Sequence, residues 1–407
     1  MTTALIIGAG VAGPVAAMAL QQAGIEAAVY EAHAGGADDI GAFLTLQSNG
    51  MDALRAIGAQ HAVGGLGFPT PSIRIVSGSG RVLGEVPNGG TLPDGTVSRT
   101  LRRSDLYRAL RDEALARGVR IERGRRLVGA HRSGGRVMAT FADGGRAEGD
   151  LLVGCDGIRS RVRGIIDPAA PPARYVPTLN LGGYARGVST SARPGEYVMV
   201  FGRRAFFGYT VAPDGETWWF ANPPRADEPS TAELAATTSQ QWRDCLLDLF
   251  ADDRSPACEL IRATPGELRG WATYDLPRVP VWHDGAMVVI GDAAHATSPS
   301  SGQGASMAIE DAVVLATCVR DLPDVPAALR AYERLRRARV ERVVAHGART
   351  SQSKVAGPVA RVLRDLMLPL FLKLAAGKGT GSLAWMHAHH IDWDAPVAAD
   401  AAAVRVV

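Results

Sequence analysis

The sequence contains 407 residues with a formal net charge of +3, and 46% of the residues are hydrophobic while 21% are charged. This is the composition of an ordinary globular chain, long enough for two domains or for one large α/β body with an insertion. The small charge, carried by arginines spread along the chain, argues against a protein that binds nucleic acid. No stretch is long and apolar enough to predict stable insertion into a membrane.

The cysteines and the first residues of the chain bear on its compartment. The four cysteines lie far apart, in no spacing typical of a metal site or a redox-active disulfide. Free thiols fit a reducing compartment, and the chain begins with an apolar, strand-like run rather than a signal peptide. We therefore expect a cytoplasmic protein without a bound metal.

The start of the sequence has the pattern of a βαβ unit that binds a dinucleotide. An apolar run at residues 4–7 predicts a buried parallel strand. Gly8, Gly10 and Gly13 follow it in the spacing G-x-G-x-x-G, which suits a tight turn, close approach to a pyrophosphate, and close packing of helix on strand. Glu31, 18 residues beyond Gly13, closes a second strand and can accept hydrogen bonds from ribose hydroxyls. Its charge would repel a ribose phosphate, so the unit favours FAD or NAD over NADP.

A helix is predicted within residues 99–118 from the period of its apolar residues, with Ser104 as the N-cap. Arg102 and Arg103 would then lie at the N-terminus of the helix, a place suited to binding an anion. The spacing alone fits two solvated arginines equally well.

A strand–Gly–Asp–helix junction is predicted at residues 150–163. The apolar run 151–153 indicates a buried strand, and Asp156 begins the turn into a helix. A carboxylate at this place can bind sugar hydroxyls or cap the helix, and the pattern does not decide between these roles.

Residues 291–304, GDAAHATSPSSGQG, form another junction of this kind. Asp292 ends an apolar run, so its carboxylate can bind the hydroxyls of a polyol, and the glycine-rich segment then opens a helix whose N–H groups would face an anion or a ring edge. FAD is long enough for one loop to hold its pyrophosphate while a distant strand end holds its ribityl chain and ring. One ligand thus explains both glycine-rich loops. His295 is expected to serve packing or backbone hydrogen bonding.

Residues 175–275 differ from the rest because β-branched and aromatic residues gather there, which predicts antiparallel strands. Alternation along a strand would pack one face on the core and leave the other to line a pocket for a flat apolar ligand. The candidate pocket residues are Arg203, which would hold an acidic group of the substrate, Phe207, Tyr209, Phe220 and Pro299. Core packing is the alternative role for each of these aromatic side chains, and a place on the charged surface is the alternative for Arg203.

These residues resemble the class A flavoprotein monooxygenases, the para-hydroxybenzoate hydroxylase-like family of single-component FAD hydroxylases. The segments GAGVAG with Glu31, CDGIRSRVR and GDAAHATSPSSGQGASMAIEDA correspond in order to the three motifs of that family, and the spacing fits from residue 1 to roughly residue 350. The resemblance implies that the ADP half of FAD is held by Gly8, Gly10, Ala12, Gly13 and Glu31.

The resemblance also assigns the other cofactor-binding residues. Arg103 would contact the FAD phosphates, and the backbone of Val128 would contact adenine. Asp156 belongs to the motif linked to both FAD and the reduced nicotinamide. Around the flavin, the implied contacts are Asp292 to a ribityl oxygen, Pro299 beside the ring, and the backbone of Gly302, Gly304 and Ala305 at the pyrimidine edge.

The fold expected from these patterns is an α/β, Rossmann-like FAD-binding domain with an inserted antiparallel β-sheet substrate domain and C-terminal helices. The predicted division assigns 1–174 and 276–350 to the FAD-binding domain, 175–275 to the substrate domain, and 351–407 to a C-terminal helical segment and tail.

The resemblance implies a monooxygenase that consumes NADPH or NADH. It would insert one oxygen atom from dioxygen into an aromatic or polycyclic, polyketide-like small molecule through a flavin hydroperoxide. The resemblance names no catalytic side chain, and it leaves the substrate, the preferred nicotinamide and the oligomeric state open. The alternatives are an epoxidase or a prenyl-chain reductase of the same fold, and a flavin-binding scaffold without turnover.

Overall fold

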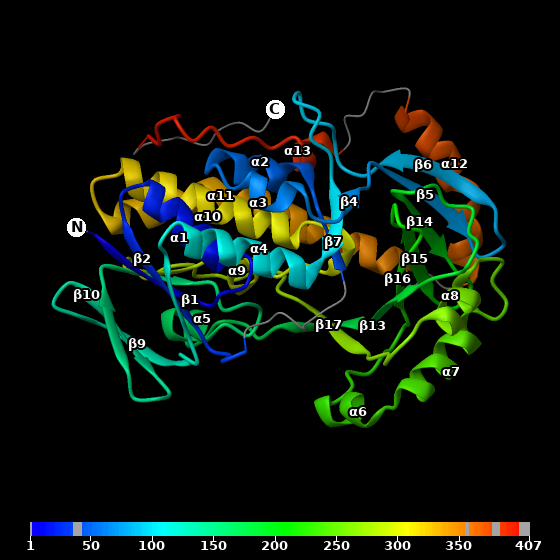
Figure 1. The fold of residues 1–407 in the computed structure, drawn as a ribbon, viewed down its shortest axis with the longest axis horizontal. Coiled ribbons are helices and arrows are strands. Elements are labelled where there is room, and N and C mark those ends of the chain that lie inside the picture. Colours follow the sequence, from blue (N-terminus) through cyan, green and yellow to red (C-terminus); the bar gives the residue numbers. More distant parts are fainter. Residues whose placement is uncertain (1, 36–42, 355–357, 377–382, 399–407) are drawn as a thin grey trace.

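A parallel sheet lies at one end of an elongated molecule and a larger, mostly antiparallel sheet lies at the other, with helices between and around them (Figure 1). This computed structural model describes residues 2–35, 43–354, 358–376 and 383–398. The predicted α/β fold, with a Rossmann-like part and a separate β-sheet layer, is confirmed.

The parallel sheet has the strand order β18–β12–β1–β2–β8. β1, β12 and β18 are short, buried apolar runs, as is typical where both faces of a parallel sheet are covered, whereas the edge strand β8 is mostly charged. Their carboxyl ends lie at one edge, which is where ligands bind in open α/β sheets. The strands are β1 (Thr3–Ile7), β2 (Glu26–Glu31), β8 (Arg120–Arg123), β12 (Leu151–Gly154) and β18 (Met287–Val289).

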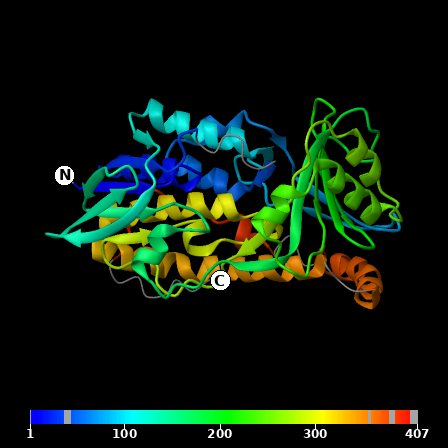
Figure 2. The same cartoon turned by 90° about the horizontal axis from the view of Figure 1, so that it is seen from below.

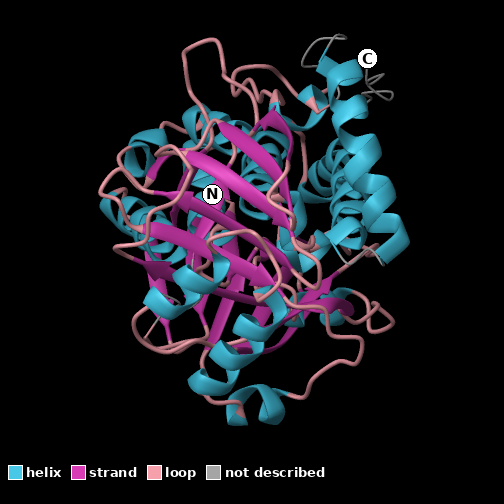
Figure 3. Ribbon diagram, turned by 90° about the vertical axis from the view of Figure 1, so that its right-hand side faces the viewer, coloured by secondary structure: helices cyan, strands magenta, loops and turns pink. Residues whose placement is uncertain are grey.

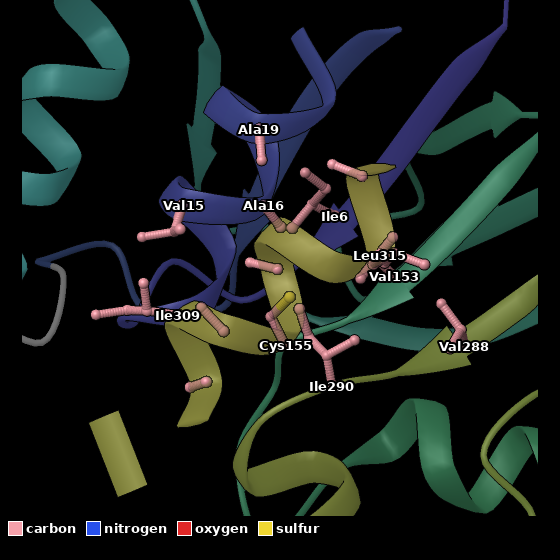
Figure 4. Close-up of a cluster of buried hydrophobic side chains, with 14 of the residues drawn as sticks. Ile6, Val15, Ala16, Ala19, Val153, Cys155, Val288, Ile290, Ile309 and Leu315 are labelled. Carbon is pink, nitrogen blue, oxygen red and sulfur yellow. The ribbon is translucent and has the colours of Figure 1, made fainter. Parts of the chain in front are cut away.

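Two helices, α1 (Ala12–Gln22) and α10 (Gly304–Asp321), pack side by side on one face of the parallel sheet. Their contact is close because small side chains line it. Figure 4 shows this core, in which Val15, Ala16 and Ala19 of α1 and Ile309 and Leu315 of α10 lie together with Ile6, Val153 and Val288 of the strands.

The remaining elements of this part of the molecule are short. A three-stranded antiparallel sheet and α5 lie on the face opposite α1, and a second small sheet lies beside α2 and α4 (Figure 1). Their bounds are β3 (Phe43–Leu46), α2 (Ser48–Ala56), α3 (Gln60–Gly64), β4 (Phe68–Pro69), β7 (Arg99–Arg102), α4 (Arg103–Ala116), β9 (Leu127–Ser133), β10 (Arg136–Phe141), β11 (Arg146–Gly149), α5 (Arg161–Ile166) and α9 (Asp292–His295).

The predicted N-cap of α4 at Ser104 is wrong. Strand β7 keeps the backbone extended through Arg102, and helical geometry begins at the next residue, Arg103. Ser104 therefore lies inside the first turn, and no side chain caps this helix.

The larger sheet, which we call the substrate sheet after the role that the sequence analysis expects for it, has seven strands in the order β17–β13–β16–β15–β14–β5–β6. Two of them come from residues 72–87, outside the range 175–275 that the sequence analysis gave to this layer. β5 pairs in parallel with β14, a long-range pairing without a local turn signal. The strands are β5 (Ser72–Ser77), β6 (Val82–Pro87), β13 (Arg174–Ala185), β14 (Glu196–Phe201), β15 (Phe206–Val211), β16 (Thr217–Asn222) and β17 (Trp271–Asp275). The division of the chain into domains stays a prediction.

The outer face of the substrate sheet carries a second hydrophobic core. The helices α6 (Thr231–Ala236), α7 (Ser239–Phe250) and α8 (Ala257–Ala263) lie beside this sheet (Figure 1). Figure 3 shows that end of the molecule from the right-hand side of Figure 1, with helices in cyan around strands in magenta. Phe207 stacks on Trp219 with ring centroids 5.4 Å apart and meets Phe250 of α7 edge-on at 5.2 Å. Tyr209, two residues along the same strand, belongs to the same buried cluster.

This packing corrects two of the predicted pocket residues. β15 and β16 pair so that Gly208 stands opposite Phe220, which puts Phe220 on the face opposite to Phe207 and Tyr209. Phe207 and Tyr209 therefore pack in the core and do not line a pocket with Phe220.

The C-terminal part of the described chain joins the two ends of the molecule. Helix α11 (Val325–Lys354) has 30 residues and runs along one side of the parallel sheet to the substrate sheet (Figure 2). The other elements are η1 (Pro299–Ser301), α12 (Pro358–Ala376), which lies against β6, and α13 (Ala384–His387). No helix in the described ranges is both long and apolar enough to cross a membrane.

Truncation of Phe207 tests the assignment of this side chain to the core. Because Phe207 is 0% exposed, Phe207→Ala is expected to lower the free energy of unfolding by about 3–5 kcal/mol. Urea denaturation followed by tryptophan fluorescence measures this. The control is Val82→Ala on the edge strand β6, where the side chain is 52% exposed and the change should stay within about 0.5 kcal/mol. Equal, small losses for both variants would contradict the assignment.

Candidate functional site

The first glycine-rich loop is closed on its protein side and open on its other side. Gly8 has a φ of +103°, and a Cβ there would lie 2.6 Å from the carbonyl oxygen of Cys155. A Cβ on Gly13 would lie 1.9 Å from the carbonyl oxygen of Gly8. A Cβ on Gly10 would meet no described atom within 4 Å. The loop thus needs two glycines for its own packing and leaves a free approach at Gly10, which fits a bound pyrophosphate.

Glu31 is held beside this loop at the end of β2. Its carboxylate accepts hydrogen bonds from the backbone amides of Ala9 and His33, each at 2.8 Å. These two bonds fix the orientation of the carboxylate, and each oxygen keeps lone pairs that can accept hydroxyls of a ribose. Ala12 is buried at the start of α1. The arrangement fits the predicted contacts of the ADP half.

Asp156 accepts hydrogen bonds from the first amides of α5, whose N-cap residue is Ser160. Its carboxylate accepts hydrogen bonds from the backbone amides of Arg161 at 2.7 Å and Val162 at 3.1 Å, and from the Ser160 hydroxyl. Burial raises the pKa of the Asp156 carboxyl, although these hydrogen bonds act to lower it. The capping role is the one that the geometry supports, while contacts to FAD or nicotinamide stay a prediction. Val128 lies close by, because its carbonyl accepts two hydrogen bonds from the Arg161 guanidinium at 3.0 and 3.2 Å.

Arg103 and Asp292 are distant in sequence but close enough in space for their charges to interact. The Nε of Arg103 donates to the Tyr107 hydroxyl. Burial alone would lower the pKa of the Arg103 guanidinium, but Tyr107 and Asp292 raise it above its ordinary value. The Asp292 carboxylate accepts no hydrogen bond from the described residues, so its lone pairs are open to a ligand hydroxyl.

The loop before α10 has the geometry of a ring-edge binding site. Pro299 is exposed at the start of η1, and Gly302 ends that turn with a φ of +63°. Gly304 and Ala305 begin α10, a helix of 18 residues, so their amides lie at the positive end of its dipole. A Cβ on Gly304 would lie 3.8 Å from the Asp292 carboxylate, which places the two parts of the motif together.

A buried network of charges behind this loop was not found from the sequence. Glu310 and Asp311 on α10 are both 0% exposed. Arg336 of α11 pairs with each of them at 2.7 Å, and Arg339 pairs with Glu310 at 2.7 Å. The only signal in the sequence is an acidic pair inside an apolar helix, and the positions of its partners required the fold.

The same network reaches the loops of the site. Asp311 accepts a hydrogen bond from the amide of Gly291 at 2.9 Å and contacts the imidazole of His295. His295 therefore contacts a buried carboxylate, whereas packing or backbone bonding was predicted. Burial alone would raise the pKa of Glu310, but Arg336 and Arg339 hold it well below its usual range.

A stripe of aromatic rings runs along the inner face of the substrate sheet and includes one ring, Phe43, from the neighbouring strand β3. Consecutive ring centroids lie 5.0–6.2 Å apart, and several rings are only partly buried. We call these rings the aromatic stripe; in order they are Tyr184, Trp218, Phe43, Phe220, Phe206 and Phe201.

Of the predicted pocket residues, Phe220 belongs to the aromatic stripe, and Pro299 lies in the loop between α9 and α10 (residues 296–303), which we call the flavin loop. Arg203 lies in neither place. It is exposed in the turn between β14 and β15, where its backbone amide donates a hydrogen bond to the Asp253 carboxylate and its carbonyl accepts one from the Arg361 guanidinium. The assignment of Arg203 to the pocket is therefore wrong, and surface charge is the reading that the structure supports. In the described ranges, no group of three or more His, Cys, Asp or Glu residues is arranged to hold a metal ion.

A pair of alanine substitutions separates the ligand-facing glycine from the packing glycine. Gly10→Ala should leave the free energy of unfolding within about 0.5 kcal/mol but weaken FAD binding, because its methyl group occupies only the open side of the loop. Gly13→Ala should destabilise the protein by about 1–3 kcal/mol or more, since its methyl group collides with Gly8. FAD titration by flavin fluorescence and denaturation of the apoprotein give the two readouts. Unchanged FAD affinity in Gly10→Ala would argue against this site.

Removal of one partner from the buried network should be costly. Arg336→Met leaves two buried carboxylates undercompensated, so we expect a loss of about 3–5 kcal/mol in the free energy of unfolding. The matched control is Arg269→Met, whose ion pair with Glu267 is 73% and 72% exposed and should contribute less than about 1 kcal/mol. Chemical denaturation of both variants measures the two losses in the free energy of unfolding. Similar losses for Arg336→Met and Arg269→Met would contradict a stabilising role of the buried network.

The comparisons with known proteins agree with this geometry. A profile of the FAD binding domain family matches residues 1–346. The chain is 32% identical to aurachin C monooxygenase/isomerase of Stigmatella aurantiaca, over 86% of this chain and 89% of that protein. It is 31% identical to the FAD-dependent urate hydroxylase of Klebsiella pneumoniae subsp. pneumoniae, over 84% of this chain and 87% of that protein.

Among solved structures, HpxO of Klebsiella pneumoniae in complex with FAD and uric acid matches with a TM-score of 0.82 and 26% identity, over 92% of this chain and 95% of that chain. The cofactor of this protein is therefore FAD, as predicted. The chain belongs to the class A FAD-dependent aromatic monooxygenases.

Proposed function

We propose that this protein inserts one oxygen atom of dioxygen into an aromatic small molecule, with NADPH or NADH as the reductant. Two features carry the proposal: the loops at the carboxyl ends of β1, β12 and β18, and the partly exposed aromatic stripe. The end of α11 connects them, because Ser351 bonds Ser298 before η1 and Lys354 contacts Phe206 of the stripe. Family membership supplies the reaction class, and the stripe favours a flat aromatic substrate.

The residues of this chain fit FAD at both ends. Gly10 offers open backbone to a pyrophosphate and Glu31 offers a fixed carboxylate to the adenosine ribose. Arg103 supplies a cation for the phosphates, and Asp292 supplies acceptors for ribityl hydroxyls. Bound FAD supplies the redox chemistry, taking up hydride from a reduced nicotinamide and activating dioxygen for transfer of one oxygen atom.

The start of α10 would contribute electrostatic stabilisation to this reaction. The amides of Gly304 and Ala305 lie at the positive end of a helix of 18 residues, where they would stabilise negative charge on the nearest edge of the flavin. The buried network keeps these amides in place, since Asp311 bonds both the Gly291 amide and Arg336. The amides then need not reorient when negative charge develops on the flavin.

The aromatic stripe has two tasks. Its rings would stack on a flat substrate, and they would keep water from the reacting ring edge. Phe206 and Trp218 are nearly fully buried, while Phe43, Phe220 and Tyr184 keep exposed surface that a bound substrate would cover.

The test is oxidation of NADPH and of NADH by the FAD-loaded protein in air, with and without urate and a panel of phenolic and polycyclic aromatics. We expect at least one aromatic compound to accelerate oxidation and to gain one oxygen atom from isotopically labelled dioxygen, detected by mass spectrometry. Arg269→Met, an exposed change, is the control that should behave as the parent protein.

The result also separates the alternatives. Oxygen added across an isolated double bond would favour an epoxidase, and reduction of a prenyl chain without oxygen uptake would favour a reductase. Retained FAD with no oxidation of either nicotinamide under any condition would favour a flavin-binding scaffold.

A further inference from the structure

Lys354, the last residue of α11, brings a cation to the aromatic stripe. Its ammonium lies 4.2 Å from the ring centroid of Phe206 and 5.6 Å from that of Phe220. It donates one hydrogen bond to the Oδ1 of Asn222, at 2.9 Å. A cation between two aromatic rings and an amide oxygen is well placed to hold a polar group of a stacked ligand.

Asn222 is itself fixed, so the position of the ammonium is set. The Nδ2 of Asn222 donates to the carbonyl of Leu179 at 3.3 Å and to the side chain of Asn180. These bonds define which end of the amide is the nitrogen, and they turn its oxygen to Lys354. An ammonium has three donors, and the described residues accept from one of them.

The charge of Lys354 has no carboxylate partner within ion-pair distance among the described residues. Arg336 and Arg339, two other cations of α11, both pair with Glu310. Burial lowers the pKa of Lys354 to about 7, which reflects the cost of a cation removed from water without a counter-ion. An anion bound next to it would remove that cost.

The preceding turns of α11 place this cation next to the flavin loop. The hydroxyl of Ser351 is hydrogen-bonded to that of Ser298, directly before η1. One turn earlier, a Cβ on Gly347 would lie 2.7 Å from the hydroxyl of Thr297, so helix and loop are in close contact. Lys354 follows Ser351 by one turn, about 4.5 Å along the helix axis. The ammonium therefore lies where the flavin loop and the aromatic stripe meet.

We propose that Lys354 determines substrate specificity by binding an ionised oxygen, a phenolate or a carboxylate, on an aromatic substrate that stacks on the aromatic stripe. This inference rests on the proposed function, because it concerns the substrate of that same site. It also replaces Arg203, the exposed arginine, as the cation that holds an acidic group. A neutral aromatic of the same shape would leave the ammonium unpaired, so it would bind more weakly.

The experiment compares charged and neutral aromatic probes of matched shape. The probes are para-nitrophenol with para-nitroanisole, and para-nitrobenzoate with its methyl ester. Each is titrated into the oxidised FAD-loaded protein without nicotinamide, and binding is followed by the difference spectrum of the flavin. The variants are Lys354→Met, which removes the charge, and Lys354→Arg, which keeps it. Arg269→Met removes an exposed charge elsewhere as the matched control.

The expected result is specific to charge. Lys354→Met should weaken binding of at least one ionised probe by about tenfold to a hundredfold. It should leave the affinity for the neutral partner and the bound FAD unchanged, and Lys354→Arg should recover part of the loss. If the phenolate is the recognised form, para-nitrophenol bound below its own pKa should show the phenolate absorption in the parent protein and not in Lys354→Met.

Two outcomes would overturn the inference. One is a parent protein that does not prefer the ionised member of either pair. The other is equal affinity of the parent protein and Lys354→Met for the ionised probes. Because no turnover is measured, these outcomes are distinct from a failure of the proposed function, which would appear as absent nicotinamide oxidation while the ionised probes still bind through Lys354.

Discussion

Two adjacent carboxylates inside the protein, Glu310 and Asp311, set the arrangement on which the cofactor loops depend. A carboxylate without exposure is tolerated only when cations and hydrogen-bond donors surround it, and here Arg336 and Arg339 supply the charge. Both arginines come from α11, so the requirement for charge balance locks α11 to α10. The amide of Gly291 completes the shell of Asp311, and this bond fixes the strand end that carries the flavin motif.

This lock also couples the cofactor side of the molecule to the substrate side. Helix α11 passes the buried carboxylates, then contacts the flavin loop at Gly347 and Ser351, and ends at Lys354 against the aromatic stripe. Arg336 and Arg339, near the middle of this helix of 30 residues, hold it through their ion pairs with Glu310 and Asp311. The place of the substrate-side cation is therefore set by charges more than four helical turns away, counted at about 5.4 Å for each turn.

The sequence predicted the parts of the site that depend on local pattern. The glycine-rich loop at Gly8 and the junctions at Asp156 and Asp292 each combine a strand, a turn and a helix within a few residues, so their backbone follows from neighbours along the chain. The carboxyl ends of parallel strands then bring them together without further information. The parallel pairing of β5 with β14 has no such local signal, which is why the range 175–275 predicted for this sheet left out β5 and β6.

The errors in the pocket have a different physical origin, the period of two along a β-strand. Phe207 and Phe220 are both aromatic and both lie in central strands, but pairing of Gly208 with Phe220 puts them on opposite faces. Composition cannot reveal that register. Lys354 was missed for a related reason, since a lysine at the end of a charged helix is typical of a solvated surface, and only the fold shows rings and an amide around it.

The unequal covering of the two faces of the substrate sheet explains how one layer serves both stability and binding. On the outer face, Phe207 and Trp219 are completely covered by the sheet and its helices, so their burial contributes to folding in the absence of any ligand. On the inner face, Phe201 and Phe220 keep part of their surface exposed, which costs free energy until something flat covers it. The same strands therefore contribute to a packed core on one side of the sheet and to a partly exposed aromatic surface that can bind a flat ligand on the other. The cation at its edge adds a requirement for charge that stacking alone would not impose.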